Sequence, residues 1–320
     1  MIAIRPERLN LAIARRCYVR CRGCYQFFGR GEPDTSAVQA SVAQFVRLGI
    51  SSVTLSGGDP LTLRGLPALI ADLRAVGVVD IKLDTVGTGL LEVGLKPPPL
   101  RIRLDHLRDL LASVDHLGLP LDGSSNASVA LFRTGRSELF RETVALLEAI
   151  DGCTNCRPVV VNTVVHRQNS GELTAILKEV SRHRSITHWN LFQYTPTDQV
   201  GSGVNDEFAI DEQNFTGACV DMLNQVGRLP REQTQFTIGP RTIRSRLGQY
   251  LLMNSDGECW LPDEKGQTVP LGPAFGREAA VLTAWGDAVL RIHGSAGRTS
   301  SLHGNTPHLG AKKPDFADVA

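Results

Sequence analysis

The first two-thirds of the chain alternate short apolar runs with amphipathic stretches. Near-continuous apolar runs are typical of strands buried in a parallel sheet, and apolar residues recurring every three to four positions predict helices. The pattern predicts strands at 9–14, 51–57, 80–87, 114–123, 157–169 and 186–196, and helices at 35–49, 66–77, 107–113, 137–150 and 172–183. Thr35 or Ser36 is the expected N-cap of the first helix, and Gly49 lies at its end.

Taken in order, these elements form six strand–helix units. Eight units are typical of a full barrel, so six predict an α/β fold with a partial (β/α)6 TIM-type barrel. The alternation of strands and helices stops after Pro196. The polar segment 197–208 predicts a connector into a small α+β C-terminal extension, which ends in a hairpin at 250–263. We therefore expect a barrel domain at 1–200, an extension at 201–296 and a disordered tail at 297–320.

Composition narrows the class of protein. Apolar residues make up 42% of the 320 positions, enough for a packed core, and the formal net charge of +1 indicates no nucleic-acid-binding surface. No apolar run reaches the length of a membrane span, and residues 1–17 are too charged for a signal peptide, which favours a cytoplasmic location without membrane contact. In that compartment the seven cysteines are expected to be reduced thiols, some of them metal ligands.

Three of these cysteines, Cys17, Cys21 and Cys24, lie close together just after the first predicted strand. A parallel barrel places its chemistry in such loops. Three thiolates on one loop can hold three irons of a [4Fe–4S] cluster and leave the fourth iron open to a small molecule. The alternatives are a structural zinc site completed by a distant ligand and a chance grouping of thiols.

A second motif, LSGGDPL at 55–61, follows the second predicted strand. Its consecutive glycines let a ligand approach the backbone and use its N–H and C=O groups. Alone, the motif is typical of an ordinary turn. At the end of the strand that follows the cysteine loop, it predicts a second part of the same site.

The cysteine triad, the SGGDPL motif and the six strand–helix units together resemble the radical S-adenosylmethionine (SAM) superfamily over residues 7–196. The resemblance implies that SAM is the missing ligand, bound to the fourth iron through its amino and carboxylate groups. It also implies that one electron from the cluster cleaves SAM to a 5′-deoxyadenosyl radical, which abstracts a hydrogen atom from substrate. The implied partners are a small polar substrate and an electron donor such as flavodoxin or ferredoxin.

The same resemblance implies roles for individual residues. Gly57, Gly58 and Asp59 would hold the methionine amino group. Thr85 and Asp122, after the third and fourth strands, would lie near the ribose or the substrate.

The cysteine loop departs from the family at one position. Many members have an aromatic residue just before the third cysteine, where this chain has Gly23. Tyr25, which follows Cys24, is expected to take over the adenine contact instead.

The fifth and sixth predicted strands and the segment 250–263 resemble viperin and compact radical SAM enzymes with a short twitch-type extension. That comparison implies that Asn162 and Arg167 reach the cofactor, with the planar guanidinium of Arg167 on the methionine carboxylate. A solvated charge at a strand end is the alternative for Arg167. Three segments, GCYQFFGRGEPD, SGGDPLTL and KLDTVGT, are most similar to sugar- and aminocyclitol-modifying epimerases and dehydrogenases of antibiotic biosynthesis.

The remaining cysteines, Cys153, Cys156, Cys219 and Cys259, are enough for a second [4Fe–4S] cluster, as the twitch resemblance allows. The first pair is also typical of a redox or zinc half-site, and Cys219, on an apolar helical face, is typical of a core residue. In the neomycin-type epimerases a cysteine of the C-terminal region returns a hydrogen atom to the substrate radical, which implies the same role for Cys259. For Cys259 the roles of hydrogen donor, cluster ligand and inert packing all stay open.

These features predict a radical SAM enzyme that epimerises a C–H carbon of a carbohydrate- or aminocyclitol-type metabolite, with Cys259 as the catalytic hydrogen donor. The alternative is dehydrogenation of an alcohol carbon of an aminoglycoside-type substrate. A further alternative is a viperin-like or peptide-modifying activity. A non-enzymatic zinc or redox protein would explain the cysteines but neither the GGDP motif nor the six units.

Overall fold

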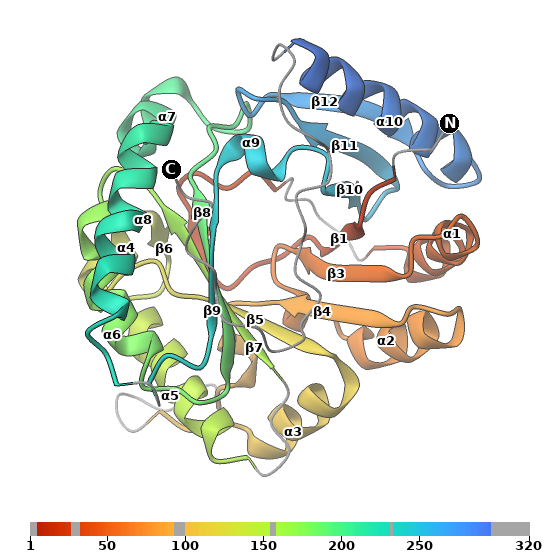
Figure 1. The fold of residues 1–320 in the computed structure, drawn as a ribbon. Coiled ribbons are helices and arrows are strands. Elements are labelled where there is room, and N and C mark those ends of the chain that lie inside the picture. Colours follow the sequence, from red (N-terminus) through yellow and green to blue (C-terminus); the bar gives the residue numbers. More distant parts are fainter. Residues whose placement is uncertain (1–4, 27–32, 93–99, 154–157, 231–232, 296–320) are drawn as a thin grey trace.

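The computed structural model describes residues 5–26, 33–92, 100–153, 158–230 and 233–295. Its centre is a ten-stranded sheet that curves into an arc, with helices on the convex side (Figure 1). The strand order is β12-β11-β10-β1-β3-β4-β5-β7-β8-β9. These strands are β1 (Arg8–Ala14), β3 (Ser52–Gly57), β4 (Asp80–Asp84), β5 (His116–Pro120), β7 (Val159–Val165), β8 (Ile186–Gln193), β9 (Thr237–Arg241), β10 (Tyr250–Asn254), β11 (Glu258–Pro262) and β12 (Thr268–Pro273).

The helices mostly connect successive parallel strands. They are α1 (Thr35–Arg47), α2 (Leu66–Ala75), α3 (Leu104–Ser113), α4 (Asn126–Phe132), α5 (Leu139–Asp151), α6 (Leu173–Val180), α7 (Ser202–Phe208), α8 (Glu212–Val226), α9 (Ile243–Arg246) and α10 (Glu278–Ser295). The N-cap of α1 is Asp34, not Thr35 or Ser36, because the Asp34 carboxylate accepts hydrogen bonds from the backbone N–H groups of Ser36 and Ala37.

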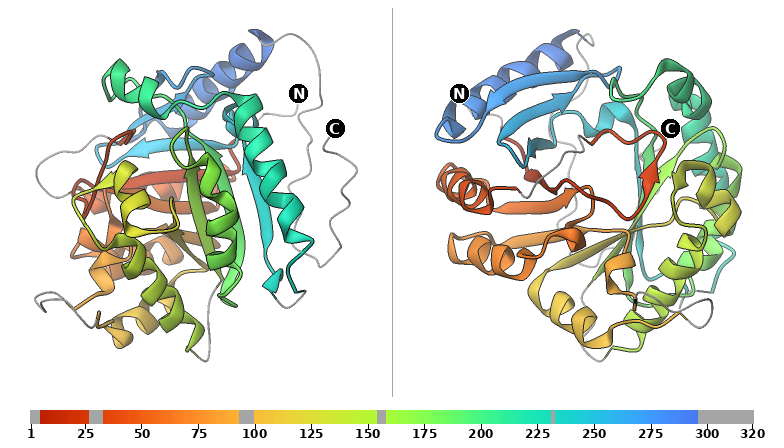
Figure 2. Two further views of the ribbon diagram at one scale, coloured as in Figure 1. Left: turned by 90° about the vertical axis from the view of Figure 1, so that its left-hand side faces the viewer. Right: turned by 180° about the vertical axis from the view of Figure 1, so that it is seen from behind.

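The predicted partial barrel with a C-terminal extension is confirmed, and its six predicted strands are β1, β3, β4, β5, β7 and β8. The extension shares the barrel's sheet. β9 pairs parallel with β8 and β10 pairs parallel with β1, so the main sheet contains eight parallel strands. The predicted hairpin is the antiparallel pair β10 and β11, followed by β12. These last strands and α10 lie beside α1 and β1 in every view (Figures 1 and 2).

Some elements differ from the sequence expectation. The expected connector 197–208 contains α7, whose residue Phe208 is fully buried and whose Asn205 bonds to the backbone of Thr197. A buried aromatic and a side chain that satisfies the preceding loop stabilise a helix that polarity alone does not predict. The pattern also missed α4 and the two-residue strand pair described below, and the expected tail at 297–320 lies outside the described residues.

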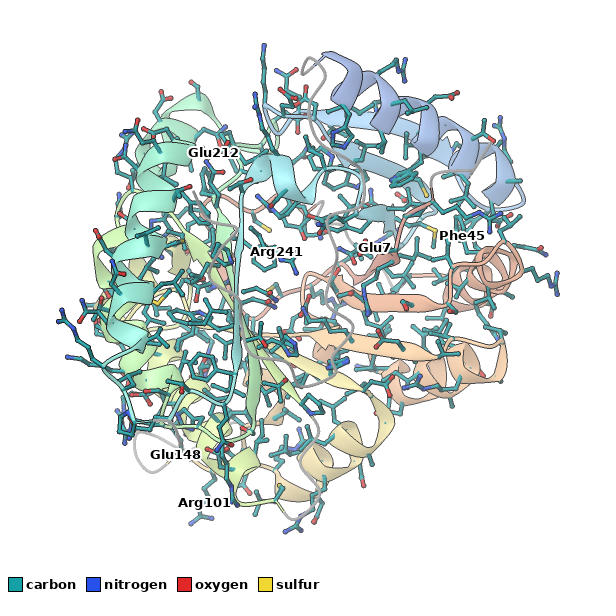
Figure 3. All side chains as sticks on the ribbon, viewed as in Figure 1. Glu7, Phe45, Arg101, Glu148, Glu212 and Arg241 are labelled. Carbon is teal, nitrogen blue, oxygen red and sulfur yellow. The ribbon has the colours of Figure 1, made fainter. Side chains whose placement is uncertain are left out.

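The two faces of the sheet differ in chemistry. The face toward the helices is apolar: Leu11, Leu55 and Leu83 are each at most 1% exposed there, and burial of such a side chain stabilises the fold by about 1.5–3 kcal/mol. The inner face carries alternate polar residues. Figure 3 shows Phe45 of α1 on the helix side and Arg241 of β9 on the inner side of the arc. Within the described ranges, no helix is long and apolar enough to cross a membrane.

Candidate active site

The cysteine loop follows β1 and is held in place by a short strand. This strand, β2 (Arg20–Cys21), pairs antiparallel with β6 (Arg133–Thr134), which follows α4. The N–H of Arg22 donates to the carbonyl of Phe132 at 2.9 Å, and the N–H of Cys24 donates to the carbonyl of Cys21 at 3.3 Å. The loop is therefore anchored on a segment far away in the sequence.

Arg133, which no sequence motif marks, joins this loop to a buried carboxylate. Its Nη1 donates to the Sγ of Cys21 at 3.2 Å, and its Nε donates to Asp122. Asp122 follows β5, is 1% exposed, and also accepts the backbone N–H of Val164 at 2.7 Å. Asp122 thereby aims the guanidinium at one of the three thiols. Its place near the ribose or the substrate stays a prediction, and no sequence pattern indicates that it pairs with an arginine.

The three thiols are half-buried and neutral in the absence of a metal. Burial raises the pKa of the Cys17 thiol to about 11 and that of Cys24 to about 12. Burial likewise raises the pKa of Cys21. A metal ion that binds sulfur displaces the proton outright, so the loop presents three donors that a metal converts to thiolates.

The two glycines of the GGDP turn pack directly on the segment that leads into the cysteine loop. The N–H of Gly58 donates to the carbonyl of Ala14 at 2.7 Å, and the N–H of Asp59 donates to the carbonyl of Arg16 at 2.6 Å. A Cβ on Gly58 would lie 2.0 Å from the Arg16 oxygen, and Gly57 has φ of +124°. No other residue fits either position, so the glycines fix the distance between the two motifs.

The Asp59 side chain stabilises the GGDP turn through hydrogen bonds. It is fully buried and accepts hydrogen bonds from the Thr85 hydroxyl at 2.8 and 2.9 Å, from the Val86 N–H at 2.9 Å and from the Leu61 N–H at 2.9 Å. Burial raises the pKa of Asp59 to about 6, against the lowering effect of these donors. Thr85 is buried as well, so this pair ties the turn to the end of β4.

A model of the radical SAM superfamily matches residues 11–180, which contain both motifs. The chain belongs to the radical SAM superfamily. The family implies a [4Fe–4S] cluster and SAM as cofactors. Among the described residues, no three His, Cys, Asp or Glu side chains converge on a single metal ion. A [4Fe–4S] cluster does not need such convergence, because each thiolate binds a different iron. Three neutral thiols on one loop therefore fit the cluster.

Relatives of the chain include peptide cyclases and GTP cyclases. The chain is 27% identical over 319 residues to the PqqA peptide cyclase of Xanthomonas euvesicatoria pv. vesicatoria, a match that covers 92% of this chain and 78% of that protein. It is 30% identical over 246 residues to a probable GTP 3′,8-cyclase of Sulfolobus acidocaldarius, covering 75% of this chain and 69% of that protein. A match to the GTP 3′,8-cyclase of Xanthomonas axonopodis pv. citri is 34% identical over 124 residues and spans only 36% of that protein.

Solved structures show the same fold. Streptococcus suis SuiB bound to S-adenosylmethionine aligns with a TM-score of 0.59 at 12% identity, covering 80% of this chain and 60% of SuiB. The anSMEcpe structure with bound AdoMet and a peptide aligns with a TM-score of 0.59 at 14% identity, covering 86% of this chain and 80% of that one. These likenesses confirm the radical SAM barrel with its C-terminal extension.

The departure at Gly23 has a structural counterpart. A Cβ on Gly23 would lie 2.5 Å from a ring carbon of Tyr194, so the Tyr194 ring fills the space in which a side chain at position 23 would begin. Tyr194 follows β8, is 2% exposed, and donates its hydroxyl proton to Asn205 at 2.8 Å. Tyr25, by contrast, is 43% exposed and its ring centroid lies 5.9 Å from that of Trp260 on β11. The contact of Tyr25 with adenine stays a prediction.

The two residues expected to reach SAM from β7 and its end have different positions. Asn162 lies on the inner face of β7, where its amide donates to Asp84 at 3.1 Å and accepts from Asn190 at 3.1 Å. Arg167 is exposed, and its backbone N–H donates to the carbonyl of Phe208. Arg133 of β6, the strand that pairs with the cysteine loop, donates to one of its thiols, and the contact of Arg167 with SAM stays a prediction.

The other cysteines are dispersed. Cys259 on β11 is 1% exposed, lies opposite Met253, and shares with it the face that contacts Ser41 of α1. Strand alternation turns it away from the inner face, and its thiol donates to the Gly257 carbonyl at 3.6 Å. Cys219 is buried in α8 near the other edge of the sheet, and Cys153 follows α5. The structure does not bring these three thiols together, and Cys156 lies outside the described residues.

Proposed function

We propose that the chain is a radical SAM enzyme that modifies a peptide. The observation that supports this proposal is the match to PqqA peptide cyclases, which covers 92% of the chain and therefore takes in the extension as well as the barrel. The fold likeness to anSMEcpe, solved with a peptide, is in keeping with it. An external electron donor of the flavodoxin or ferredoxin class is part of the proposal.

Each part of the site has a defined task in this proposal. Cys17, Cys21 and Cys24 hold the cluster, and the bound cluster with SAM supplies the 5′-deoxyadenosyl radical. The backbone carbonyls of Gly57 and Gly58 would accept hydrogen bonds from the methionine amino group. Asp59 acts on that group only through the turn, because its carboxylate already accepts from Thr85, Val86 and Leu61.

The geometry disfavours the main prediction from the sequence, an epimerase with Cys259 as hydrogen donor. A donor thiol has to reach the face of the substrate radical. Cys259 is directed instead into the apolar layer between the sheet and α1, and its proton is engaged by the Gly257 carbonyl. The relatives described above are peptide and GTP cyclases.

A nucleotide substrate is the second candidate. It rests on the 30% identity to the probable GTP 3′,8-cyclase of Sulfolobus acidocaldarius over 75% of this chain.

An anaerobic assay separates the candidates. The reconstituted, reduced enzyme is incubated with SAM and with a pool of synthetic peptides, with GTP or with the aminocyclitol glycoside neamine, and 5′-deoxyadenosine is measured by mass spectrometry. Peptide modification requires that the peptide pool stimulates 5′-deoxyadenosine formation and that a peptide changes mass. Stimulation by GTP alone supports the second candidate, and stimulation by neamine alone restores the sugar hypothesis. A Cys17→Ala/Cys21→Ala/Cys24→Ala variant is the control and is expected to be inactive in all three.

A further inference from the structure

A group of basic side chains lies on the inner face of the sheet, apart from the cysteine loop and the GGDP turn. Lys82 of β4 and His116 of β5 are directly paired in register, and Arg241 of β9 lies across the arc from them. Their neighbours along each strand, such as Leu83 and Leu117, are fully buried against the helices, so alternation directs these basic residues inward. His188 of β8 occupies the same face, next to fully buried Trp189.

Water reaches this face. The side chains of Asp84 and His116 remain 33% and 29% exposed although both lie in central strands. The interior of a filled barrel is packed by layers of branched apolar side chains. This interior is instead polar and accessible, which is the property expected of a region that binds a polar ligand.

Two glycines make room for the polar groups. A Cβ on Gly118 of β5 would lie 1.8 Å from the Oδ1 of Asp84, so the Asp84 side chain occupies the space above this glycine. A Cβ on Gly239 of β9 would lie 3.2 Å from the Oδ1 of Asn190 and 3.6 Å from the Nε of Arg241. Side chains larger than hydrogen at either position would displace the groups that give this face its chemistry.

The charges on this face do not cancel. Lys82 pairs with Asp84 at 3.0 Å, and Arg8 of β1 pairs with Asp80. The side chain of Arg241 forms no ion pair or hydrogen bond with any residue that the structure describes, so among these residues its positive charge has no counterion. Guanidinium groups of this kind are the preferred partners of carboxylates, which they bind through two parallel N–H donors.

The histidines add neutral donors and acceptors. The Nδ1 of His188 lies 2.9 Å from the Thr187 hydroxyl, which also lies 3.4 Å from the Val159 carbonyl. In the tautomer that accepts the Thr187 proton at Nδ1, the Nε2–H of His188 is free to donate. The Nδ1 of His116 is buried without a partner among the described residues. Burial lowers the pKa of His188, and the nearby charges of Lys82 and Arg241 lower it further, which keeps the ring neutral at pH 7.

We propose that Arg241, with His188 and Asn190 beside it, binds a carboxylate of the substrate on the inner face of the barrel. The proposal rests on the proposed function and narrows it to peptides that place an acidic side chain or a carboxyl terminus near the site of reaction. A single uncompensated charge matches one carboxylate. The several charges of a nucleoside triphosphate call for more positive charge than this face offers.

The test is equilibrium dialysis of the cluster-loaded, SAM-bound enzyme with radiolabelled N-acetylglutamate. N-acetylglutamine, of the same shape without the charge, and inorganic phosphate are the comparison probes. We expect N-acetylglutamate to bind more tightly than both, and Arg241→Gln to weaken its binding about tenfold or more. Arg244→Gln, at an exposed arginine of α9, is the matched control and is expected to bind like wild type. Thermal unfolding shows whether each variant is folded.

The proposal is overturned if N-acetylglutamine binds as well as the acid, if folded Arg241→Gln binds like wild type, or if no probe binds. Tighter binding of phosphate would also overturn the assignment to a carboxylate and would favour the nucleotide candidate. Because dialysis requires no turnover, its result is independent of the peptide assay. Binding that depends on Arg241, without modification of any peptide, would contradict the proposed function but support the carboxylate site. Peptide modification without binding that depends on Arg241 would support the proposed function and contradict the carboxylate site.

Discussion

Two buried carboxylates lie on opposite sides of the cysteine loop and are held in different ways. Among the described residues, the donors to Asp59, after β3, are all neutral, namely the Thr85 hydroxyl and two backbone N–H groups. Asp122, after β5, accepts one backbone N–H and is ion-paired with Arg133. Both are at most 1% exposed. Asp59 therefore links the backbone of the GGDP turn to that of the segment after β4. Asp122 instead holds the positively charged Arg133 guanidinium beside the Cys21 thiol.

The two sides also differ in how a buried titratable group responds to pH. On the Asp59 side, burial raises a carboxyl pKa to about 6. On the Asp122 side, His166 at the end of β7 is fully buried beside Phe132, and burial lowers its pKa to about 4. A carboxyl group that prefers to be protonated and an imidazole that prefers to be neutral respond to pH in opposite directions. The two sides of the site can thus be perturbed separately.

The largest effect is expected from Arg133→Met. The substitution keeps an apolar side chain of similar length but leaves the Asp122 charge buried without its partner, which costs about 3–5 kcal/mol. Urea unfolding of the cluster-free chain measures this loss. Arg141→Met is the matched control, because Arg141 forms an exposed ion pair with Glu138 worth about 0–1 kcal/mol. Equal losses in the two variants would show that Arg133 and Asp122 do not form the pair described here.

His166→Phe is expected to change the pH dependence of stability. The folded-state pKa of His166 is about 4 against an ordinary 6.5, so the unfolded chain binds the extra proton between these values. The contribution of neutral His166 is therefore complete above pH 6.5 and is lost as the pH falls toward 4, by about 3 kcal/mol at most. Urea midpoints between pH 7 and 4 should fall less steeply in the variant. An unchanged slope would contradict the burial of a neutral imidazole at this position.

Asp59→Asn is expected to act in the opposite direction. The folded-state pKa of Asp59 is about 6 against an ordinary 3.8, so its contribution is complete below pH 3.8 and is lost as the pH rises through 6. Relative to wild type, the asparagine variant should gain about 2–3 kcal/mol of stability between pH 4 and 7. The Asp59→Asn/His166→Phe double variant should show the sum of both slope changes, because the two groups lie on different sides of the loop. A strongly non-additive result would show that they are coupled.

The smallest effect is expected from Thr85→Val. This change removes the hydroxyl that donates to Asp59 and accepts the Gly87 N–H, but leaves the two backbone N–H donors of Asp59, so the loss is about 1–2 kcal/mol. It should also raise the pKa of Asp59 further, because the ionised form loses a donor. A carboxyl-carbon NMR titration of the two proteins measures that pKa. A lower pKa in the variant would mean that Thr85 does not donate to Asp59.

The parts of the molecule that were predictable from the sequence are local. Six strands, most helices, the cysteine loop and the GGDP turn each leave a signal within about a dozen residues. The pairing of Arg133 with Cys21, the packing of Tyr194 on Gly23 and the parallel pairing of β10 with β1 join distant segments, and a single sequence contains no trace of them. Cys259 illustrates the limit. Its strand was predicted, but the side it faces follows from its register with Met253 and from the position of α1.

The pairing of β1 with β10 has a consequence for folding during synthesis. Arg8 lies beside Tyr250 in the sheet, so the strand that leads into the cysteine loop has an open edge until the chain is synthesised almost to its last strands. Contacts between such distant segments form slowly, because the entropy cost of closing a long loop precedes the stabilisation that the contacts provide. During translation the three thiols therefore emerge early on a strand that lacks one of its two neighbours. The sheet beneath the cysteine loop is therefore complete only once residues 250–254 have been synthesised.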